Sequence, residues 1–324
     1  MLKSTLPLLL IGSIAASAAT EEKLNQRYSV QPGGTLVVEV DFGAINVSTN
    51  ATSEVVIDVW RKIGRKKKAD EEAFLRDHPV TFAQDGNTVT IRSQSKTRSS
   101  WSSSGRNSNE AKYTLTVPAQ FSAQLKTGGG PIDAVDLTGE VRADTGGGGL
   151  SFAHLTGPLR GQTGGGSVKA GACEGSITLH TGGGGIEVNS SAGTLEGTTG
   201  GGSVTVREFQ GPARVHTGGG GLMIEKVQGA VDGSTGGGSI SAVLPSEVSG
   251  PVKLSTGGGG ITVSAPATAA FELDARTSGG GVSTDLPVAV VGKVEHGRLQ
   301  GPVNGGGKTV ELRSGGGSIR LKKL

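Results

Sequence analysis

The sequence has few aromatic residues, a single cysteine and no long apolar segment. Phe, Trp and Tyr make up 3% of the 324 residues, which is low for a globular core but compatible with a thin, repetitive one. Cys173 stands alone, so no disulfide can form within the chain. The net charge is only +3. We therefore expect neither a nucleic-acid partner nor a transmembrane span in the mature chain.

The first 18 residues have the features of a signal peptide. Lys3 precedes an apolar run from Leu6 to Ala16, and Ala16-Ser17-Ala18 has the small-x-small form of a cleavage site. The run is about eleven residues long, whereas a spanning helix needs ~18. We expect residues 1–18 to be removed and the mature chain to be exported to the periplasm, the cell surface or the extracellular space.

An internal repeat dominates the rest of the chain. Gly triplets begin every 18 residues at 128, 146, 164, 182, 200, 218 and 236, and continue less regularly at 257, 279, 305 and 315. Thr precedes the first eight triplets, and the last three follow Ser278, Asn304 and Ser314. A fixed period predicts a repeat architecture in which each unit stacks on its neighbours.

Apolar residues occupy two columns within these units and alternate with polar ones. The first column lies two residues after each triplet: Ile132, Leu150, Val168, Ile186, Val204, Leu222 and Ile240. The second lies two residues after a mid-unit Gly: Val141, Leu159, Ile177, Leu195, Ala213 and Val231. Such alternation is typical of half-buried strands. It predicts an all-β fold, a parallel β-helix or β-solenoid with about 18-residue rungs of two strands each.

The units also alternate in two small positions. The residue after each triplet depends on the residue two positions before the Thr. Where that earlier residue is large, as Leu179 is, the triplet is followed by Gly. Where it is Gly, as at Gly161, the triplet is followed by Ser. We interpret the two positions as sharing one gap in the interior, where bulk on one side excludes bulk on the other.

Residues 126–324 should form the Gly-rich solenoid, and residues 19–125 an irregular β region that caps it. Alternating or β-branched segments predict strands at 35–40, 44–47, 55–60, 88–93 and 113–117, with a hairpin at 85–87 and a short helix at 69–77. A basic insertion covers Arg61 to Lys68, and Trp101 lies in a Ser-rich segment expected to form a loop.

At the C-terminal end, a charged strand at 318–324 should close the array against further pairing.

The sequence offers no catalytic constellation, metal site or cofactor site. His180 and His216 share a column but lie two rungs apart, at ~9.6 Å, too far to bind one metal. Cys173 falls in a column of core residues that includes Leu155 and Phe209. The Gly triplets lead into strands, so they do not match a phosphate-binding loop. We expect a non-catalytic protein without cofactors.

The only regular surface feature predicted is a column of Thr side chains beside a strip of bare Gly backbone. This candidate contact surface consists of Thr145, Thr163, Thr181, Thr199, Thr217, Thr235 and Thr256. A packing role for these residues remains the alternative.

The segments Tyr113-Thr-Leu-Thr-Val-Pro118 and Leu125-Lys-Thr-Gly-Gly-Gly130, followed by the Thr-Gly-Gly-Gly units, resemble a known family. It is the bacterial putative-adhesin family of unknown function built from β-strand repeats. The resemblance covers roughly 30–324 and implies a β-solenoid, but it brings no catalytic residues, since the family has no established common activity. The long Gly runs and the insertion at Arg61 to Lys68 depart from the family pattern.

Three functional hypotheses follow. The first is an adhesin or cell-envelope protein whose solenoid face binds a cell-surface glycan, the matrix or an envelope protein. The second is an envelope scaffold that self-associates through its Gly strip. The third is a polysaccharide-active β-helix enzyme, which would need a pair of acidic residues on one face. The sequence leaves the ligand and the oligomeric state open.

Overall fold

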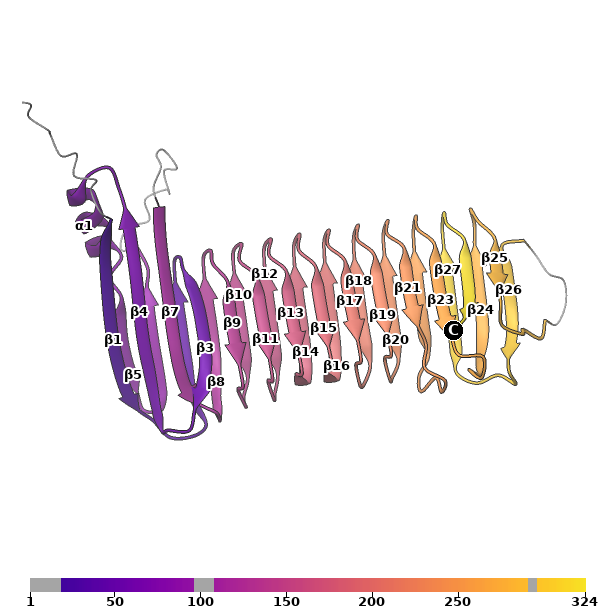
Figure 1. Ribbon diagram of the computed structural model, residues 1–324, viewed down its shortest axis with the longest axis horizontal. Helices are drawn as coiled ribbons and strands as arrows, with labels where there is room; N and C mark the ends of the chain where they lie inside the picture. Colours follow the sequence, from indigo (N-terminus) through magenta and orange to yellow (C-terminus); the bar gives the residue numbers. More distant parts are fainter. Residues whose placement is uncertain (1–18, 96–107, 291–295) are drawn as a thin grey trace, which may run out of the picture.

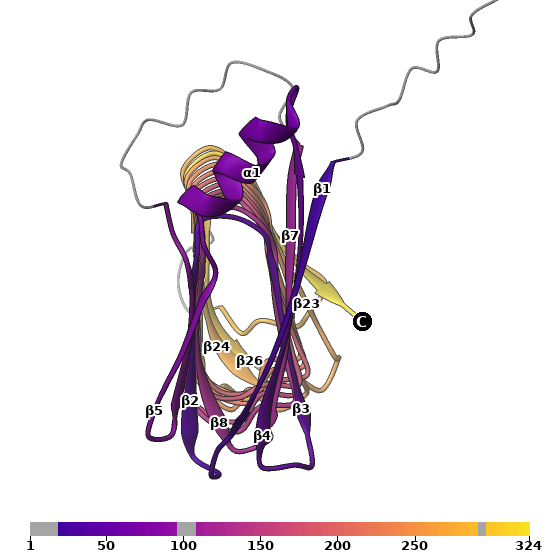
Figure 2. The ribbon, with the colours of Figure 1, turned by 90° about the vertical axis from the view of Figure 1, so that its left-hand side faces the viewer.

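The computed structural model describes residues 19–95, 108–290 and 296–324 and shows an elongated solenoid made of two sheets (Figure 1). Each sheet has 14 strands, and seen along the long axis they form two facing layers joined by narrow corners (Figure 2). Strands stack at ~4.8 Å, so 14 of them extend over ~62 Å. The predicted fold class is confirmed.

Sheet A contains, in spatial order, β1 (Thr20–Ser29), β4 (Glu54–Gly64), β7 (Ser108–Pro118), β3 (Ala44–Asn50), β9 (Ile132–Val135), β11 (Leu150–Ala153), β13 (Val168–Gly171), β15 (Ile186–Asn189), β17 (Val204–Arg207), β19 (Leu222–Glu225), β21 (Ile240–Val243), β23 (Ile261–Ala265), β28 (Ile319–Lys323) and β25 (Val282–Thr284).

Sheet B contains, again in spatial order but from the other end of the solenoid, β26 (Arg298–Val303), β24 (Phe271–Thr277), β27 (Thr309–Ser314), β22 (Val252–Thr256), β20 (Val231–Thr235), β18 (Ala213–Thr217), β16 (Ala192–Thr199), β14 (Glu174–Thr181), β12 (Leu159–Thr163), β10 (Val141–Thr145), β8 (Phe121–Thr127), β2 (Gly34–Val40), β6 (Thr88–Ser93) and β5 (Thr81–Asp85). The helix α1 (Lys68–Asp77) lies beside the N-terminal rungs (Figure 2).

The regular rungs pair in parallel with an offset of 18 residues. Leu159 pairs with Ile177 in sheet B, and Leu150 pairs with Val168 in sheet A. Each of the two apolar columns therefore stacks on itself, and its members are at most 5% exposed. The polar residues between them point outward, so the sequence alternation alone fixes which side of each strand faces the core.

One corner of each rung requires unusual backbone conformations. The mid-unit glycines have φ between 119° and 154°, a region that L residues avoid. The same corner also contains a column of non-Gly residues in the left-handed region, with φ of 47° to 62°: Asp136, His154, Ala172, Ser190, Glu208 and Lys226. Each such residue costs roughly 1–2 kcal/mol. The sequence pattern did not reveal this second column.

Chain order and spatial order differ at both ends of the solenoid. Strands β2 and β3 lie between the rung of β6 and β7 and the rung of β8 and β9. Strands β27 and β28 likewise lie between β22 and β23 on one side and β24 and β25 on the other. The prediction that residues 318–324 close the array is therefore wrong, because β28 has a partner on each side. The C-terminal end is closed by β25 and by β26, which pairs antiparallel with β24.

The predicted strands and helix of the N-terminal region are present, and the hairpin of β5 and β6 turns at residues 85–88. The expected boundary between residues 125 and 126 falls within β8. Both sheets continue across it, because β8 pairs with β2 and with β10 in sheet B, and β3 pairs with β9 in sheet A. The segment around Trp101 lies outside the described residues.

Two details of the repeat differ from the sequence interpretation. The triplet at 305–307 is not a rung corner, because it joins β26 and β27, which belong to the same sheet on either side of β24; Asn304, Gly305 and Gly306 have positive φ there. The proposed shared gap is also wrong, because Gly161 faces the interior while Ser167 is exposed on the outside of the corner. A Cβ on Gly161 would lie 2.9 Å from the Phe152 ring and 3.3 Å from Leu179. The glycine makes room for neighbouring core side chains, and Ser167 has no part in it.

Candidate functional site

The Thr column lies inside the solenoid and not on its surface. Its seven predicted members are between 0% and 6% exposed. Each hydroxyl donates a hydrogen bond to the carbonyl of the last triplet Gly in the preceding rung, as Thr163 Oγ1 does to Gly148 O at 2.7 Å. It also accepts one from an amide of its own corner, as from Gly166 N at 3.2 Å. The column joins successive corners, so the expectation of a Thr contact surface is corrected: these side chains are not available to a ligand.

The triplets beside the Thr column bring backbone close to backbone. A Cβ on Gly166 would lie 2.0 Å from Gly148 O, and a Cβ on Gly164 would lie 2.3 Å from Gly146 O. No side chain fits at such distances. At the middle position the situation is different, because a Cβ on Gly165 would meet nothing within 4 Å. The fold thus explains the first and third Gly of the triplet.

The outer face of sheet B contains a groove of about 560 Å³ that crosses six neighbouring strands, β14, β16, β18, β20, β22 and β27. Small or compact side chains line it at or near the start of the six strands: Ser176, Thr194, Pro212, Ala230, Pro251 and Thr309. At ~4.8 Å per strand, the groove is ~24 Å long. It has the dimensions of a site for an elongated ligand lying along the solenoid axis.

Charged side chains of alternating sign follow the groove one rung after another. They are Glu196, Arg214, Asp232, Lys253 and Glu311. Arg214 Nε lies 3.5 Å from the Asp232 carboxylate. Exposed pairs of this kind contribute at most about 1 kcal/mol to stability. No aromatic side chain lines the groove, so recognition there would depend on hydrogen bonds and charge.

The same groove bears on the enzyme hypothesis, which needs two neighbouring acidic groups. Glu196 and Asp232 belong to one outward column but lie two rungs apart, at ~9.6 Å, with Arg214 in the rung between them. Arg214 is ion-paired with Asp232. Within the groove the two acids are therefore separated by a base, whereas Asp274 of β24 and Glu311 of β27 are adjacent acids that both contact Arg313.

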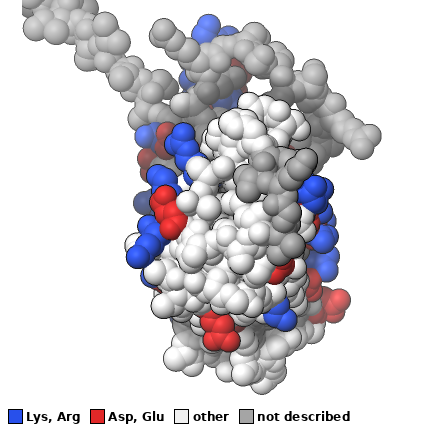
Figure 3. Space-filling model, turned by 90° about the vertical axis from the view of Figure 1, so that its right-hand side faces the viewer, with Lys and Arg blue, Asp and Glu red and all other residues white. Residues whose placement is uncertain are grey.

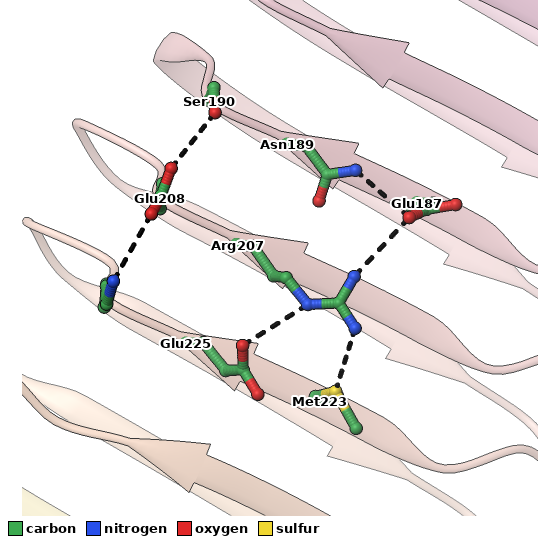
Figure 4. Close-up of polar contacts among 8 residues, drawn as sticks. Glu187, Asn189, Ser190, Arg207, Glu208, Met223 and Glu225 are labelled. Carbon is green, nitrogen blue, oxygen red and sulfur yellow. Dashed lines mark hydrogen bonds and ion pairs between the residues drawn. The ribbon is translucent and has the colours of Figure 1, made fainter.

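The outer face of sheet A carries a network of polar contacts on three neighbouring strands, β15, β17 and β19 (Figure 4). The Arg207 guanidinium lies 3.5 Å from the Glu187 carboxylate and 3.3 Å from that of Glu225. Beside it, Glu208 accepts hydrogen bonds from Ser190 and Lys226, and these lower its pKa. These contacts connect three successive rungs on the outer face of sheet A.

Cys173 and His216 lie in different environments. Cys173 is 1% exposed, and burial raises the pKa of its thiol. His216 is exposed and contacts Ser234 on the next rung. Within the described ranges, no group of His, Cys, Asp and Glu side chains has the arrangement needed to hold a metal ion.

The basic insertion divides into a buried part and an exposed part. Arg61 is 1% exposed and donates to the Glu22 carboxylate and to His78 O. The Arg65 guanidinium lies 4.6 Å above the Phe74 ring of α1. Within the insertion, only residues 66–68, all Lys, are exposed. The insertion mainly attaches β1 and α1 to the end of sheet A.

Comparison with known proteins identifies the family. The chain belongs to the Toastrack family DUF4097, which matches residues 34–322. A search of curated proteins gives no significant match. The described part of the chain contains no helix long and apolar enough to cross a membrane.

Several solved structures are similar to this chain. A "putative adhesin" from Bacteroides fragilis is 12% identical, with 94% of this chain and 97% of that chain covered and a TM-score of 0.36. A "putative adhesin" from Parabacteroides distasonis is 13% identical over 93% and 97%, with a TM-score of 0.43. A "putative lipid binding protein" from the same species is 10% identical over 93% and 97%, with a TM-score of 0.38. Function is a property of a site and not of a fold, so it must be argued from this chain's own surface.

Proposed function

We propose that this protein is an exported, non-catalytic adhesin or envelope protein that binds an elongated polar partner along the groove of sheet B. The groove carries this proposal, because it is a large concave surface that successive rungs build from equivalent positions. Its alternating charges suit a partner with both donors and acceptors, such as a glycan chain or an extended segment of an envelope protein.

Two further features support a binding scaffold. The outward carboxylates of the groove are separated by basic residues, which favours binding over hydrolysis. Most of the groove lies on paired strands, so a ligand would meet a preorganised surface. The signal peptide expected at residues 1–18 would deliver this surface to the cell envelope.

The test is binding of the mature chain to envelope fractions and to a broad glycan panel. Thr194→Tyr places an aromatic ring in the groove and should abolish binding. Thr205→Tyr is the matched control, because Thr205 occupies an outward position on β17 of sheet A. Absence of any binding by the wild-type chain, or equal loss in both variants, would contradict the proposal. Sedimentation of the wild type at high concentration separately tests the self-associating alternative, which requires oligomers.

A further inference from the structure

Three arginines lie side by side on the outer face of sheet B near the C-terminal end of the solenoid. Arg276 of β24 pairs directly with Arg298 of β26 and with Arg313 of β27. Neighbouring strands lie ~4.8 Å apart, so the three side chains leave the same face within ~10 Å. Figure 3 shows charged side chains along both sides of this end of the molecule and few across its centre.

Such an arrangement is unfavourable unless other charges balance it, because like charges on directly paired strand positions repel each other. Asp274 balances two of the arginines, with its carboxylate 3.0 Å from Arg276 Nε and 2.7 Å from Arg313 Nη2. Glu311 adds a contact of 3.2 Å to Arg313 Nε. Two carboxylates thus face three guanidinium groups.

Arg298 is the arginine without a carboxylate partner among the described residues. Its guanidinium donates a hydrogen bond of 2.7 Å to the side-chain oxygen of Gln300, a neutral acceptor. Since guanidinium groups present five donors, most of those on Arg298 remain directed to solvent. The uncompensated positive charge therefore belongs to this residue.

A cavity of about 630 Å³ lies against the three arginines. Its lining also includes the hydroxyl side chains of Ser255 and Ser278, and no carboxylate lines it. Asp274 and Glu311 contact the arginines without lining this cavity. The cavity consequently presents cationic donors and hydroxyl groups to its contents.

We propose that this cavity binds a phosphate or sulfate group through Arg276, Arg298 and Arg313. Planar guanidinium groups match the oxygen spacing of these anions and bind them with paired hydrogen bonds. The hydroxyl of Ser255 supplies a further donor, because Ser255 pairs with Arg313 on the adjacent strand. A bound anion would also offset the repulsion among the arginines, so that its binding stabilises this end of the solenoid.

The carrier of the anion is inferred from the position of the cavity, and this step rests on the proposed function. The groove and the cavity share strands β22 and β27, with Lys253 and Glu311 lining the groove and Ser255 and Arg313 lining the cavity. A chain lying in the groove would place a substituent near the arginines. We therefore expect the phosphate or sulfate to be an ester on a glycan.

Calorimetric titration of the mature chain with inorganic phosphate and with sulfate, at constant ionic strength in chloride, tests the site itself. We expect saturable binding that Arg298→Gln weakens by at least ~10-fold, equivalent to about 1.4 kcal/mol. Arg160→Gln is the control, since Arg160 is also exposed on the outer face of sheet B but lies on β12, far from the cavity. No saturable binding, or equal weakening by both substitutions, would overturn the proposal.

A second titration separates the site from its carrier. Thr194→Tyr should leave the binding of inorganic phosphate and sulfate unchanged while it abolishes glycan binding in the groove, so the two proposals fail independently. A sulfated oligosaccharide should bind more tightly than inorganic sulfate, and Arg298→Gln should weaken its binding as well. Preferential binding to vesicles of an anionic phospholipid, with no gain for the oligosaccharide, would overturn the glycan assignment.

Discussion

The corner Thr hydroxyls are each used twice, as donor to the preceding rung and as acceptor within their own. Thr199 Oγ1 donates to Gly184 O at 2.7 Å and accepts from Gly202 N at 3.2 Å. The methyl group is buried with the hydroxyl, so the side chain fills space as well. Ser314 makes equivalent contacts in its rung, to Gly259 O and from Gly317 N. The hydroxyl is therefore what the corner requires, and the methyl group adds packing.

Substitution of Thr199 by Val should destabilise the solenoid by roughly 1–3 kcal/mol, since the shape is kept while a buried carbonyl and amide lose their partner. Thr199→Ser should cost less, about 1 kcal/mol, because only a buried methyl group is removed. Urea unfolding followed by circular dichroism measures both. A Ser variant as unstable as the Val variant would show that packing outweighs the hydrogen bonds.

The triplet offers a second comparison between adjacent residues. Gly166→Ala should be strongly destabilising, by several kcal/mol, because the new methyl group would collide with the rigid backbone at Gly148 O, at 2.0 Å. Gly165→Ala should change stability by less than about 1 kcal/mol, because its methyl group would point into open space. Thermal unfolding midpoints of the two variants give the answer. Similar losses in both would mean that the middle Gly is also constrained.

At the scale of strands, alternation predicted most of the observed elements, since inward residues such as Ile177 and outward ones such as Thr178 differ in polarity. The corners were less accessible to sequence reasoning. Ala172 and Glu208 adopt left-handed conformations although neither residue type favours them, because their neighbours in the stack impose the corner. The groove was also missed, since Pro212 and Ala230 are unremarkable alone. Only their recurrence at one position of successive rungs, Ser176 and Thr194 included, could have indicated it.

The contact between β24 and β27 should be sensitive to acid. The Arg313 guanidinium lowers the pKa of the Asp274 carboxyl in the folded chain. Its contribution to stability is therefore complete above the pKa of about 3.9 that Asp has when unfolded, and is lost as the pH falls through the lower folded value. The difference in thermal midpoint between wild type and Asp274→Asn should be constant near neutral pH and shrink below about pH 4. A difference independent of pH down to pH 2 would contradict this assignment.

At the scale of the whole molecule, the repeat behaves as a one-dimensional array whose interior alternates between two kinds of rung. Large residues such as Leu179 and Val215 alternate with Gly161, Gly197 and Gly233 at one inward position. The sequence predicted the array and this alternation. It could not predict that chain order and spatial order differ at the two ends. Pairing there joins residues that are distant in the chain, and no local sequence pattern indicates which strands become neighbours.

Deletion of whole rungs tests this alternation. Removal of residues 164–199 takes out two rungs and leaves Gly161 next to Val215, so the alternation is kept. Removal of residues 164–181 alone brings Gly161 next to Gly197 and creates a void, which costs stability in proportion to its volume. We expect the thermal midpoint to fall more for the single-rung deletion than for the two-rung deletion. The opposite order would show that rung number matters more than interior fit.

The insertion of β27 and β28 between rungs that precede them in the chain has a kinetic consequence. Residues 271–284 must leave open a space one rung wide, which residues 309–323 fill afterwards. If β24 and β25 instead stack directly on β22 and β23, the later strands lose their place, and the chain is trapped until that pairing dissolves. Refolding should accordingly show a fast phase and a slow phase. The amplitude of the slow phase measures the fraction of molecules in which β24 and β25 first stacked on β22 and β23.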